Sequence, residues 1–266
     1  MSEVYWITGA SSGIGEAVSM LLAGRGDRII LSARRESELE RVRLACIDAG
    51  AEANNIIVLP LDVTATDQLP VKAKQAMDCF GQIDHLFNNA GLSQRSLCMD
   101  TQLSTYRQLF EVDVLGQIAL TQAVLPYMLS AGRGHVSVTA SVAGKIGVPY
   151  RTGYCAAKHA VMGFFDALRA EVAHQGIRVS TVVPGFIRTN ISVAALNGDG
   201  TAFGAVDDDI ANGMDVDKAA RQIVAGWDKR RPEIPVGEGK EMQALWLKRL
   251  LPTLVFRLVA KRMPQR

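Results

Sequence analysis

Val4-Tyr5-Trp6-Ile7-Thr8-Gly9-Ala10-Ser11-Ser12-Gly13-Ile14-Gly15 lies near the start of the chain, where an apolar run leads directly into a glycine-rich turn. The apolar residues 4–7 indicate a buried strand. The glycines at 9, 13 and 15 permit a tight turn and a close approach of the backbone to a ligand. Residues 15–24 then carry an apolar stripe that predicts an amphipathic helix, whose free N–H groups attract a diphosphate. The segment therefore predicts a dinucleotide-binding turn.

Two arginines follow the second expected strand, which covers residues 28–33. Enzymes that prefer NAD usually place an Asp or Glu at this tip to hold the ribose 2′-OH. Arg34 and Arg35 stand there instead, and a guanidinium offers a 2′-phosphate a bidentate, charge-assisted contact. We therefore expect NADP(H), with Arg34 as the first contact. The alternative is that both arginines are solvated residues at a helix start, and Ser12 adds no second basic residue in the turn.

Strand signals alternate with helical stretches along the rest of the chain. The remaining expected strands are 56–63, 83–88, 135–141 and 179–185, and the expected helices are 36–49, 71–80, 106–116, 120–129 and 155–174. This alternation predicts an α/β fold: a single-domain Rossmann fold with a doubly wound parallel sheet of about seven strands and helices on both faces. Residues 1–266 fit one domain, with cofactor and substrate at the carboxyl ends of the strands.

Tyr154 and Lys158 are four residues apart, which places a phenol and an ammonium on one face of a helix. A nearby cation favours the phenolate, so the pair can transfer protons as an acid-base catalyst. Taken alone, this spacing more often marks an ordinary surface pair. The dinucleotide turn at the start of the chain shifts the interpretation towards catalysis.

The glycine turn together with Tyr154 and Lys158 resembles the short-chain dehydrogenase/reductase family, in its compact single-domain branch. Asn88-Asn89-Ala90-Gly91 resembles the family's fourth-strand signature, and Ser141 lies thirteen residues before Tyr154, as the family pattern requires. The resemblance implies that Ser141 donates a hydrogen bond to the substrate oxygen. It implies that Tyr154 gives this oxygen a proton as hydride arrives from the nicotinamide, and that Lys158 holds the nicotinamide ribose. It also implies a homodimer or homotetramer.

The same resemblance implies a set of cofactor contacts. Asp62 would contact the adenine ring, and the loop at Pro184-Gly185 would seat the nicotinamide. The full set is Gly9, Ser11, Ser12, Gly13, Ile14, Gly15, Arg34, Arg35, Asp62, Val63, Asn89, Ala90, Gly91, Tyr154, Lys158, Pro184, Gly185, Ile187 and Thr189.

One position departs from the family pattern. By resemblance, the helix at 106–116 should carry an Asn that distorts it locally, so that a backbone carbonyl can hold a water linked to the catalytic lysine, but this chain has Asp113. Asp lacks the NH₂ donor of Asn and normally carries charge. Asp113 therefore either supports Lys158 or weakens the proton relay, and we place it with the catalytic residues.

The expected function is that of an NADP(H)-dependent oxidoreductase that reduces a ketone or aldehyde, or oxidises the alcohol, of a small or lipidic substrate. The alternative is a non-catalytic NADPH-binding sensor, which Asp113 alone favours. The formal net charge of +2 argues against a nucleic-acid partner. The four cysteines and four histidines are scattered, so no metal site is expected. The chain starts without an apolar leader, which predicts a cytoplasmic location.

Two C-terminal segments are expected to shape the substrate site. Residues 190–213 are rich in Gly, Ala and Asp, and we interpret them as a substrate lid, with an ordinary surface loop as the alternative. Residues 240–266 form an apolar and basic extension that could lie on a membrane surface, cap a neighbouring subunit or close the substrate pocket. We favour packing against protein, because Pro252 interrupts the apolar face. Asn190-Ile191-Ser192-Val193 and this extension resemble the dehydrogenase/reductase member-7 type, which includes membrane-associated reductases of lipidic, steroid or retinoid carbonyls.

Overall fold

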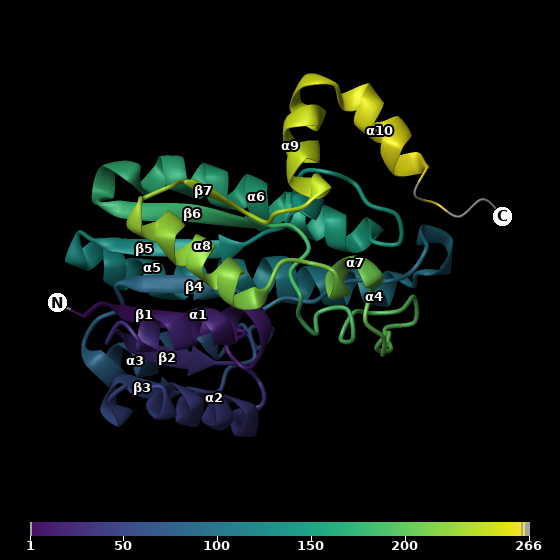
Figure 1. The fold of residues 1–266 in the computed structure, drawn as a ribbon. Coiled ribbons are helices and arrows are strands. Elements are labelled where there is room, and N and C mark those ends of the chain that lie inside the picture. Colours follow the sequence, from purple (N-terminus) through teal and green to yellow (C-terminus); the bar gives the residue numbers. More distant parts are fainter. Residues whose placement is uncertain (1, 262, 264–266) are drawn as a thin grey trace.

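The computed structural model describes residues 2–261 and residue 263. Seven parallel strands form one sheet in the order β3-β2-β1-β4-β5-β6-β7, and their carboxyl ends lie along one edge (Figure 1). The strands are β1 (Val4–Thr8), β2 (Arg28–Ser32), β3 (Ile56–Val58), β4 (His85–Asn88), β5 (Gly134–Thr139), β6 (Ile177–Pro184) and β7 (Glu233–Val236). The order reverses between β1 and β4, and this switch point is where open α/β sheets bind their ligands.

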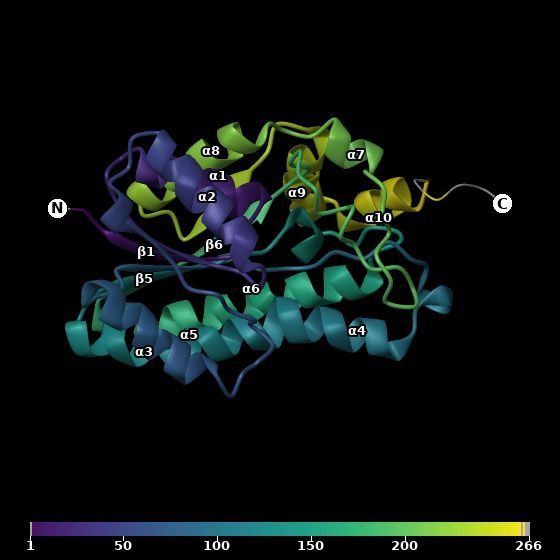
Figure 2. The same ribbon diagram turned by 90° about the horizontal axis from the view of Figure 1, so that it is seen from below.

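Helices cover both faces of the sheet (Figure 2). One layer holds α1 (Gly13–Ala23), α2 (Glu36–Asp48) and α8 (Val216–Asp228). The other holds α3 (Leu69–Phe80), α4 (Leu103–Phe110), α5 (Gly116–Ala131) and α6 (Thr152–Val172). Shorter elements are η1 (Ala53–Asn55), η2 (Cys98–Asp100), η3 (Glu111–Leu115), η4 (Val142–Gly144), η5 (Ala173–Gln175) and α7 (Asp208–Ala211), and α9 (Lys240–Leu250) and α10 (Pro252–Ala260) complete the chain.

Strand β1 is apolar over residues 4–7 because both of its faces are buried. All five residues of β1 are buried, and alternate side chains enter different cores: Val4 and Trp6 pack with α3, α5 and α6, whereas Tyr5 and Ile7 pack with α1, α2 and α8. This two-sided burial explains why the strand shows a continuous apolar run rather than an alternating pattern. The expected Rossmann fold is confirmed.

Some element boundaries differ from the sequence-based expectation. The third strand ends at Val58 rather than residue 63, although the N–H groups of Leu59 and Leu61 still donate to the carbonyls of Leu31 and Ala33. The helix expected at 120–129 starts at Gly116 and joins α4 through η3, a π-helical turn. The expected distortion at Asp113 is therefore present. The structure also contains helix α8 at 216–228 and strand β7 at 233–236, which the sequence analysis does not assign.

The continuous helical stretch Leu103–Ala131 is the single described segment whose length and apolar composition would allow it to cross a bilayer. Here it includes α5, which packs on β4 and β5 of the sheet. A core helix of a globular domain meets the same criteria.

Two histidines lie side by side in the core, although they are fifty residues apart in sequence. His85 and His135 are register partners on β4 and β5, and their rings stack with centroids 4.0 Å apart. Each ring hydrogen-bonds a serine hydroxyl, Ser137 or Ser180. Burial lowers the pKa of His135 to about 3 and the pKa of His85 well below its ordinary value. Both rings are therefore held neutral.

This pair predicts a loss of stability in acid. The folded pKa of each histidine lies below the unfolded value of 6.5, so the unfolded chain binds more protons below about pH 6.5, and for His135 this window extends down to about pH 3. The contribution of these two histidines to the free energy of unfolding is fully present above about pH 6.5 and is lost as the pH falls below that value. We expect His135 alone to lower the free energy of unfolding in urea by about 2 kcal/mol between about pH 7 and about pH 5, and His85 to act in the same direction.

The control for this prediction is His174→Gln, which changes an exposed histidine and should leave the pH slope as it is. His135→Gln should make the slope shallower. Equal slopes in the wild type and His135→Gln would contradict the assignment.

Candidate active site

A cavity of about 470 Å³ lies at the carboxyl ends of β1, β2 and β4. Its wall contains most of the residues expected to bind the cofactor: Gly9, Ser11, Ser12, Gly13, Ile14, Arg34, Arg35, Asp62, Val63, Asn89, Ala90, Gly91, Tyr154, Lys158 and Thr189. Gly15 lies just outside it in α1, while Pro184, Gly185 and Ile187 line a second cavity. Ser32, Leu92 and Val112 also line the first cavity and were not expected there.

The turns after β1 and β4 are joined by the Thr8 hydroxyl. It accepts hydrogen bonds from the N–H groups of Asn89 and Ala90 at 2.9 and 3.0 Å. The Asn89 amide donates to the carbonyl of Thr8 at 3.2 Å, and its oxygen accepts from Thr139 at 3.0 Å. Asn89 thus links the ends of β1, β4 and β5 and shapes the floor of the cavity.

Glycine is required in this turn because the backbone passes so closely. Gly9 has φ +63°, and a Cβ at Gly15 would stand 2.3 Å from the Gly9 carbonyl oxygen. Any residue other than glycine at position 15 would therefore overlap the turn after β1. The resulting backbone cradle fits a diphosphate at the helix N-terminus.

Arg34 and Arg35 lie on the rim of this cavity at the end of β2. Both side chains are exposed, and neither guanidinium has a hydrogen bond or ion pair with a described residue. Arg41, in contrast, forms ion pairs with Glu16 and Glu38. The two arginines at the strand tip therefore keep their donors available for an anionic group.

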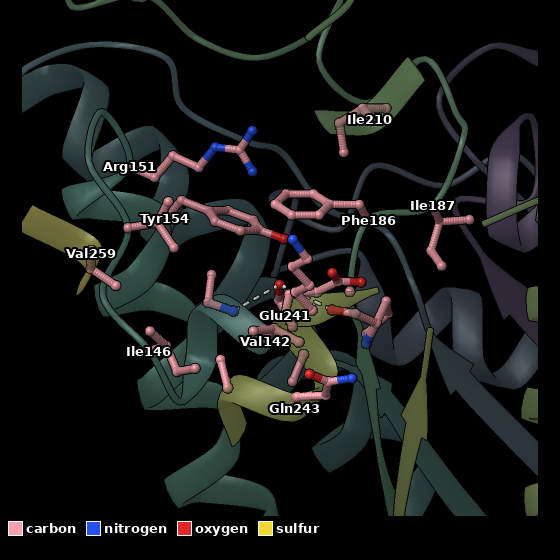
Figure 3. Close-up of a pocket in the computed structure, with 18 of the residues that line it drawn as sticks. Val142, Ile146, Arg151, Tyr154, Phe186, Ile187, Ile210, Glu241, Gln243 and Val259 are labelled. Carbon is pink, nitrogen blue, oxygen red and sulfur yellow. Dashed lines mark hydrogen bonds between the residues drawn. The ribbon is translucent and has the colours of Figure 1, made fainter. Parts of the chain in front are cut away.

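A second cavity of about 720 Å³ adjoins the first, and its walls are mostly apolar (Figure 3). Val142 and Ile146 line it from the segment after β5, Phe186 and Ile187 from the loop after β6, and Val259 from α10. Ser141 also lines it. The Ser141 Oγ accepts from the Ala143 N–H at 3.1 Å and donates to the Pro184 carbonyl at 3.5 Å. That donated bond is long and weak, so the hydroxyl can turn to another acceptor.

Tyr154 and Lys158 lie on the inner face of α6. Tyr154 is 7% exposed and Lys158 is 3% exposed. The Lys158 Nζ donates to the Thr139 carbonyl at 2.9 Å and lies 5.7 Å from the centre of the Tyr154 ring. A buried ammonium thus stands beside a phenol, as the spacing in the sequence predicts.

Tyr154 forms part of the wall of both cavities. Lys158 lines only the first cavity and Ser141 only the second. Ile14, Thr139, Thr189 and Ile191 share the boundary with Tyr154. A molecule in one cavity can therefore meet a molecule in the other at the phenol.

Asp113 projects from the π-helical turn η3 towards the same lysine. Its carboxylate is fully buried, with Oδ2 3.5 Å from the Lys158 Nζ, and Oδ1 accepts the Leu92 N–H at 2.7 Å. Burial raises the pKa of Asp113, and both the Lys158 ammonium and the Leu92 N–H oppose this shift. The Asp113 carboxylate is thus in direct contact with Lys158, whereas the resemblance implied a link through a backbone carbonyl and a water.

Ion pairs tie the expected lid, residues 190–213, to the loop after β4 and to the start of α6. The Asp207 Oδ2 is 2.6 Å from Arg95 and 3.0 Å from Arg151, and the side chain of Asp207 is 4% exposed. Arg151 lines the second cavity close to Tyr154 (Figure 3). Sequence reasoning missed Arg95, Arg151 and Asp207. Of these three residues, only Arg151 could have been noticed in the sequence, because it lies three residues before Tyr154.

Helices α9 and α10 form one wall of the second cavity and project beyond the end of the sheet (Figure 1). The Lys248 ammonium donates to the Lys145 carbonyl, and Val255 is buried. Trp246 and Leu250 also line the cavity, although they are 72% and 75% exposed. Of the three roles considered for the extension, the structure thus places it against the pocket. Residues 262 and 264–266 of the extension lie outside the described residues.

The sequence of this chain is similar to those of known proteins. Residues 3–200 match the short chain dehydrogenase family. The chain is 41% identical over 262 residues to the dehydrogenase/reductase SDR family protein 7-like of Drosophila melanogaster, covering 98% of this chain and 80% of that protein. It is 41% identical over 252 residues to the human dehydrogenase/reductase SDR family member 7, covering 94% of this chain and 74% of the human protein.

The fold also matches solved structures. The short chain dehydrogenase/reductase of Burkholderia phymatum, crystallised in complex with NAD, aligns with a TM-score of 0.83 at 26% identity, over 100% of this chain and 97% of that one.

The glycine cradle predicts that Gly15→Ala destabilises the protein. The added Cβ would overlap the Gly9 carbonyl, and overpacking of this kind costs about 1–3 kcal/mol. Gly163→Ala is the matched control, because Gly163 lies in α6 with open space around its Cβ. This change should stabilise the helix by about 0.5–1 kcal/mol. Urea unfolding of both variants measures the difference, and similar effects at the two sites would contradict the cradle.

Proposed function

Because the chain belongs to the short-chain dehydrogenase/reductase family and is of the member-7 type, we propose that it is an NADP(H)-dependent oxidoreductase. It reduces a ketone or aldehyde, or oxidises the corresponding alcohol. One observation carries this proposal: the cavity that contains Lys158 and the glycine turn meets the cavity that contains Ser141 at a single phenol, Tyr154. Hydride transfer needs this arrangement, with one site for the nicotinamide and an adjoining site for the carbonyl.

Ser141, Tyr154 and Lys158 have different roles in this reaction. Ser141 turns its hydroxyl from the Pro184 carbonyl to the substrate oxygen, and Tyr154 donates a proton to that oxygen. Lys158 favours the phenolate that results, because its ammonium stands beside the ring. A bound nicotinamide cofactor supplies the hydride. In the oxidation direction Tyr154 is the base.

The residues present fit a dinucleotide with a 2′-phosphate. Gly9 and Gly15 let the turn after β1 pack tightly against the start of α1, whose free N–H groups favour an anion such as a diphosphate. The unpaired donors of Arg34 and Arg35 stand at the tip of β2, where the adenine ribose lies in Rossmann folds. Charge-assisted bonds from a guanidinium to a phosphate support the preference for NADP(H).

The proposed substrate is a small or lipidic carbonyl compound. The walls of the second cavity are mostly apolar, and a volume of about 720 Å³ is sufficient for a molecule of drug size. Segment 190–213 acts as the lid, held over the cavity by Asp207. We also propose a homodimer or homotetramer, on the family resemblance alone. Membrane contact through the extension and a cytoplasmic location stay predictions.

Replacing the phenol tests the mechanism. Tyr154→Phe should lower turnover at least ~100-fold, because a positioned proton donor contributes about that much. NADPH binding should stay nearly unchanged, since the ring still fills the wall. The assays are NADPH oxidation across aliphatic, aromatic and steroid carbonyls, and NADPH titration by fluorescence.

Tyr106→Phe is the matched control, because the Tyr106 hydroxyl bonds Thr152 at an exposed site and should be dispensable. Near-normal rates in Tyr154→Phe would refute the role of the phenol. A wild-type protein that binds NADPH tightly but oxidises it with none of the carbonyls would favour the sensor.

Reversing the charge at the β2 tip tests cofactor choice. Arg34→Asp should lower the ratio of NADPH to NADH efficiency at least ~10-fold, because it removes a charge-assisted contact and repels the 2′-phosphate. Arg25→Asp is the control, since Arg25 is an exposed arginine paired with Asp228 outside the cofactor cavity. An unchanged ratio in Arg34→Asp would show that Arg34 does not select the cofactor.

A further inference from the structure

The contact between Asp113 and Lys158 has a chemical requirement that Asn could not meet. Two donors converge on the Asp113 side chain, the Leu92 N–H at 2.7 Å from Oδ1 and the Lys158 ammonium at 3.5 Å from Oδ2. A carboxylate offers an acceptor to each of them. The amide of Asn has one oxygen, so its NH₂ group would face the ammonium once the oxygen bonds Leu92. This geometry fits an acid rather than an amide.

Each of the two groups has one other polar partner, the Thr139 carbonyl for the Lys158 Nζ at 2.9 Å and the Leu92 N–H for Oδ1. Oδ2 is buried and accepts no hydrogen bond from the described residues. A Cβ at Gly91 would stand 3.1 Å from Oδ1 and 3.4 Å from the Lys158 Nζ, so the segment before Leu92 closes tightly over the pair. Burial raises the pKa of Asp113, and the Lys158 ammonium is the charge that opposes this rise. The Lys158 ammonium, 3.5 Å from Oδ2, is therefore the contact that favours the ionised carboxylate over the neutral acid.

Other charged groups face the phenol from farther elements. In the second cavity these are Arg151 at the start of α6 and Lys240 and Glu241 of α9, and on the cofactor side they are Arg34, Arg35 and Asp62. None of them forms an ion pair with Lys158 among the residues that the structure describes. Arg151 is already paired with Asp207. The charge nearest to the catalytic ammonium is thus that of Asp113.

We propose that Asp113 is a positioning residue that acts through Lys158: its carboxylate holds the ammonium in place and offsets part of its charge, and so sets the pH range in which Tyr154 can give up its proton. The proposal rests on the proposed function and deepens it. The proton-transfer unit of this chain then consists of three side chains rather than two.

The sign of the effect follows from the charges. With Asp113 ionised, the phenolate of Tyr154 sees an ammonium partly neutralised by a carboxylate. Without the carboxylate, the ammonium acts on the phenol with its full charge and favours the phenolate more strongly. The phenol should then ionise at a lower pH.

A titration of Tyr154 measures this without any turnover. The chain has five tyrosines, so the tyrosinate absorbance of Tyr154 is obtained by subtracting the titration of Tyr154→Phe from that of the parent. The same subtraction is made in an Asp113→Asn background. We expect Asp113→Asn to move the ionisation of Tyr154 downward by about one pH unit. An unchanged or raised midpoint would overturn the proposal, whether or not the protein reduces carbonyls.

The rate profile and two further variants show that the effect passes through Lys158. In the reduction assay, the alkaline limb of kcat should move to lower pH in Asp113→Asn, with KM for the carbonyl nearly unchanged. In a Lys158→Met background, Asp113→Asn should leave the ionisation of Tyr154 where it is. A shift of the same size in that background would mean that Asp113 acts on the phenol directly and would overturn the proposal.

Asp84→Asn is the matched control, because Asp84 is a mostly buried carboxylate just before β4, at the opposite end of that strand, where it accepts the Val4 N–H. It should leave the ionisation of Tyr154 unchanged, and an equal shift there would overturn the proposal. If Asp113→Asn does not fold on its own, the proposal is tested instead by comparing the melting temperatures of Lys158→Met and of the double variant. Lys158→Met leaves a buried carboxylate unpaired, so adding Asp113→Asn should raise its melting temperature. A lower melting temperature in the double variant would also overturn the proposal.

Discussion

The close contact of two turns at the carboxyl ends of β1 and β4 governs the whole arrangement. One hydroxyl, that of Thr8, accepts two N–H groups from the turn after β4, while Asn89 reaches back to the carbonyl of Thr8 and across to Thr139. The contact is so close that glycine alone fits at the start of α1. The cofactor cavity is the space these two turns leave open, and its depth and position follow from this contact.

Much of the fold was predictable because its signals are local. The apolar run of β1 and the following glycines predict a strand, a turn and a helix within twenty residues, and both faces of a parallel sheet demand that such runs be apolar. Tyr154 and Lys158 gained meaning from spacing on one helix. The family resemblance then supplied Ser141 and Asp113, and the structure brings all four side chains to one place.

The remaining features depend on contacts between distant segments, which no local pattern encodes. Asp207 meets Arg95 and Arg151 only because a loop after β6 folds over the start of α6. His85 and His135 become neighbours through strand register, although they looked scattered in the sequence. The direct contact of Asp113 with Lys158 follows from the π-helical turn, whereas the sequence identified only an unusual residue at that position.

The walls of the two cavities come from different parts of the fold. The cofactor cavity is built from strand ends and the turns that hold the sheet together, whereas one wall of the substrate cavity comes from α9 and α10. Helix α9 has no fully buried residue and α10 has only Val255, so these helices contribute less to the core than the strands and the helices on the sheet do. Substitutions in this wall can therefore change the second cavity while the glycine turn and Tyr154 stay in place. The fold thus separates the part that can evolve new selectivity from the part that must be kept.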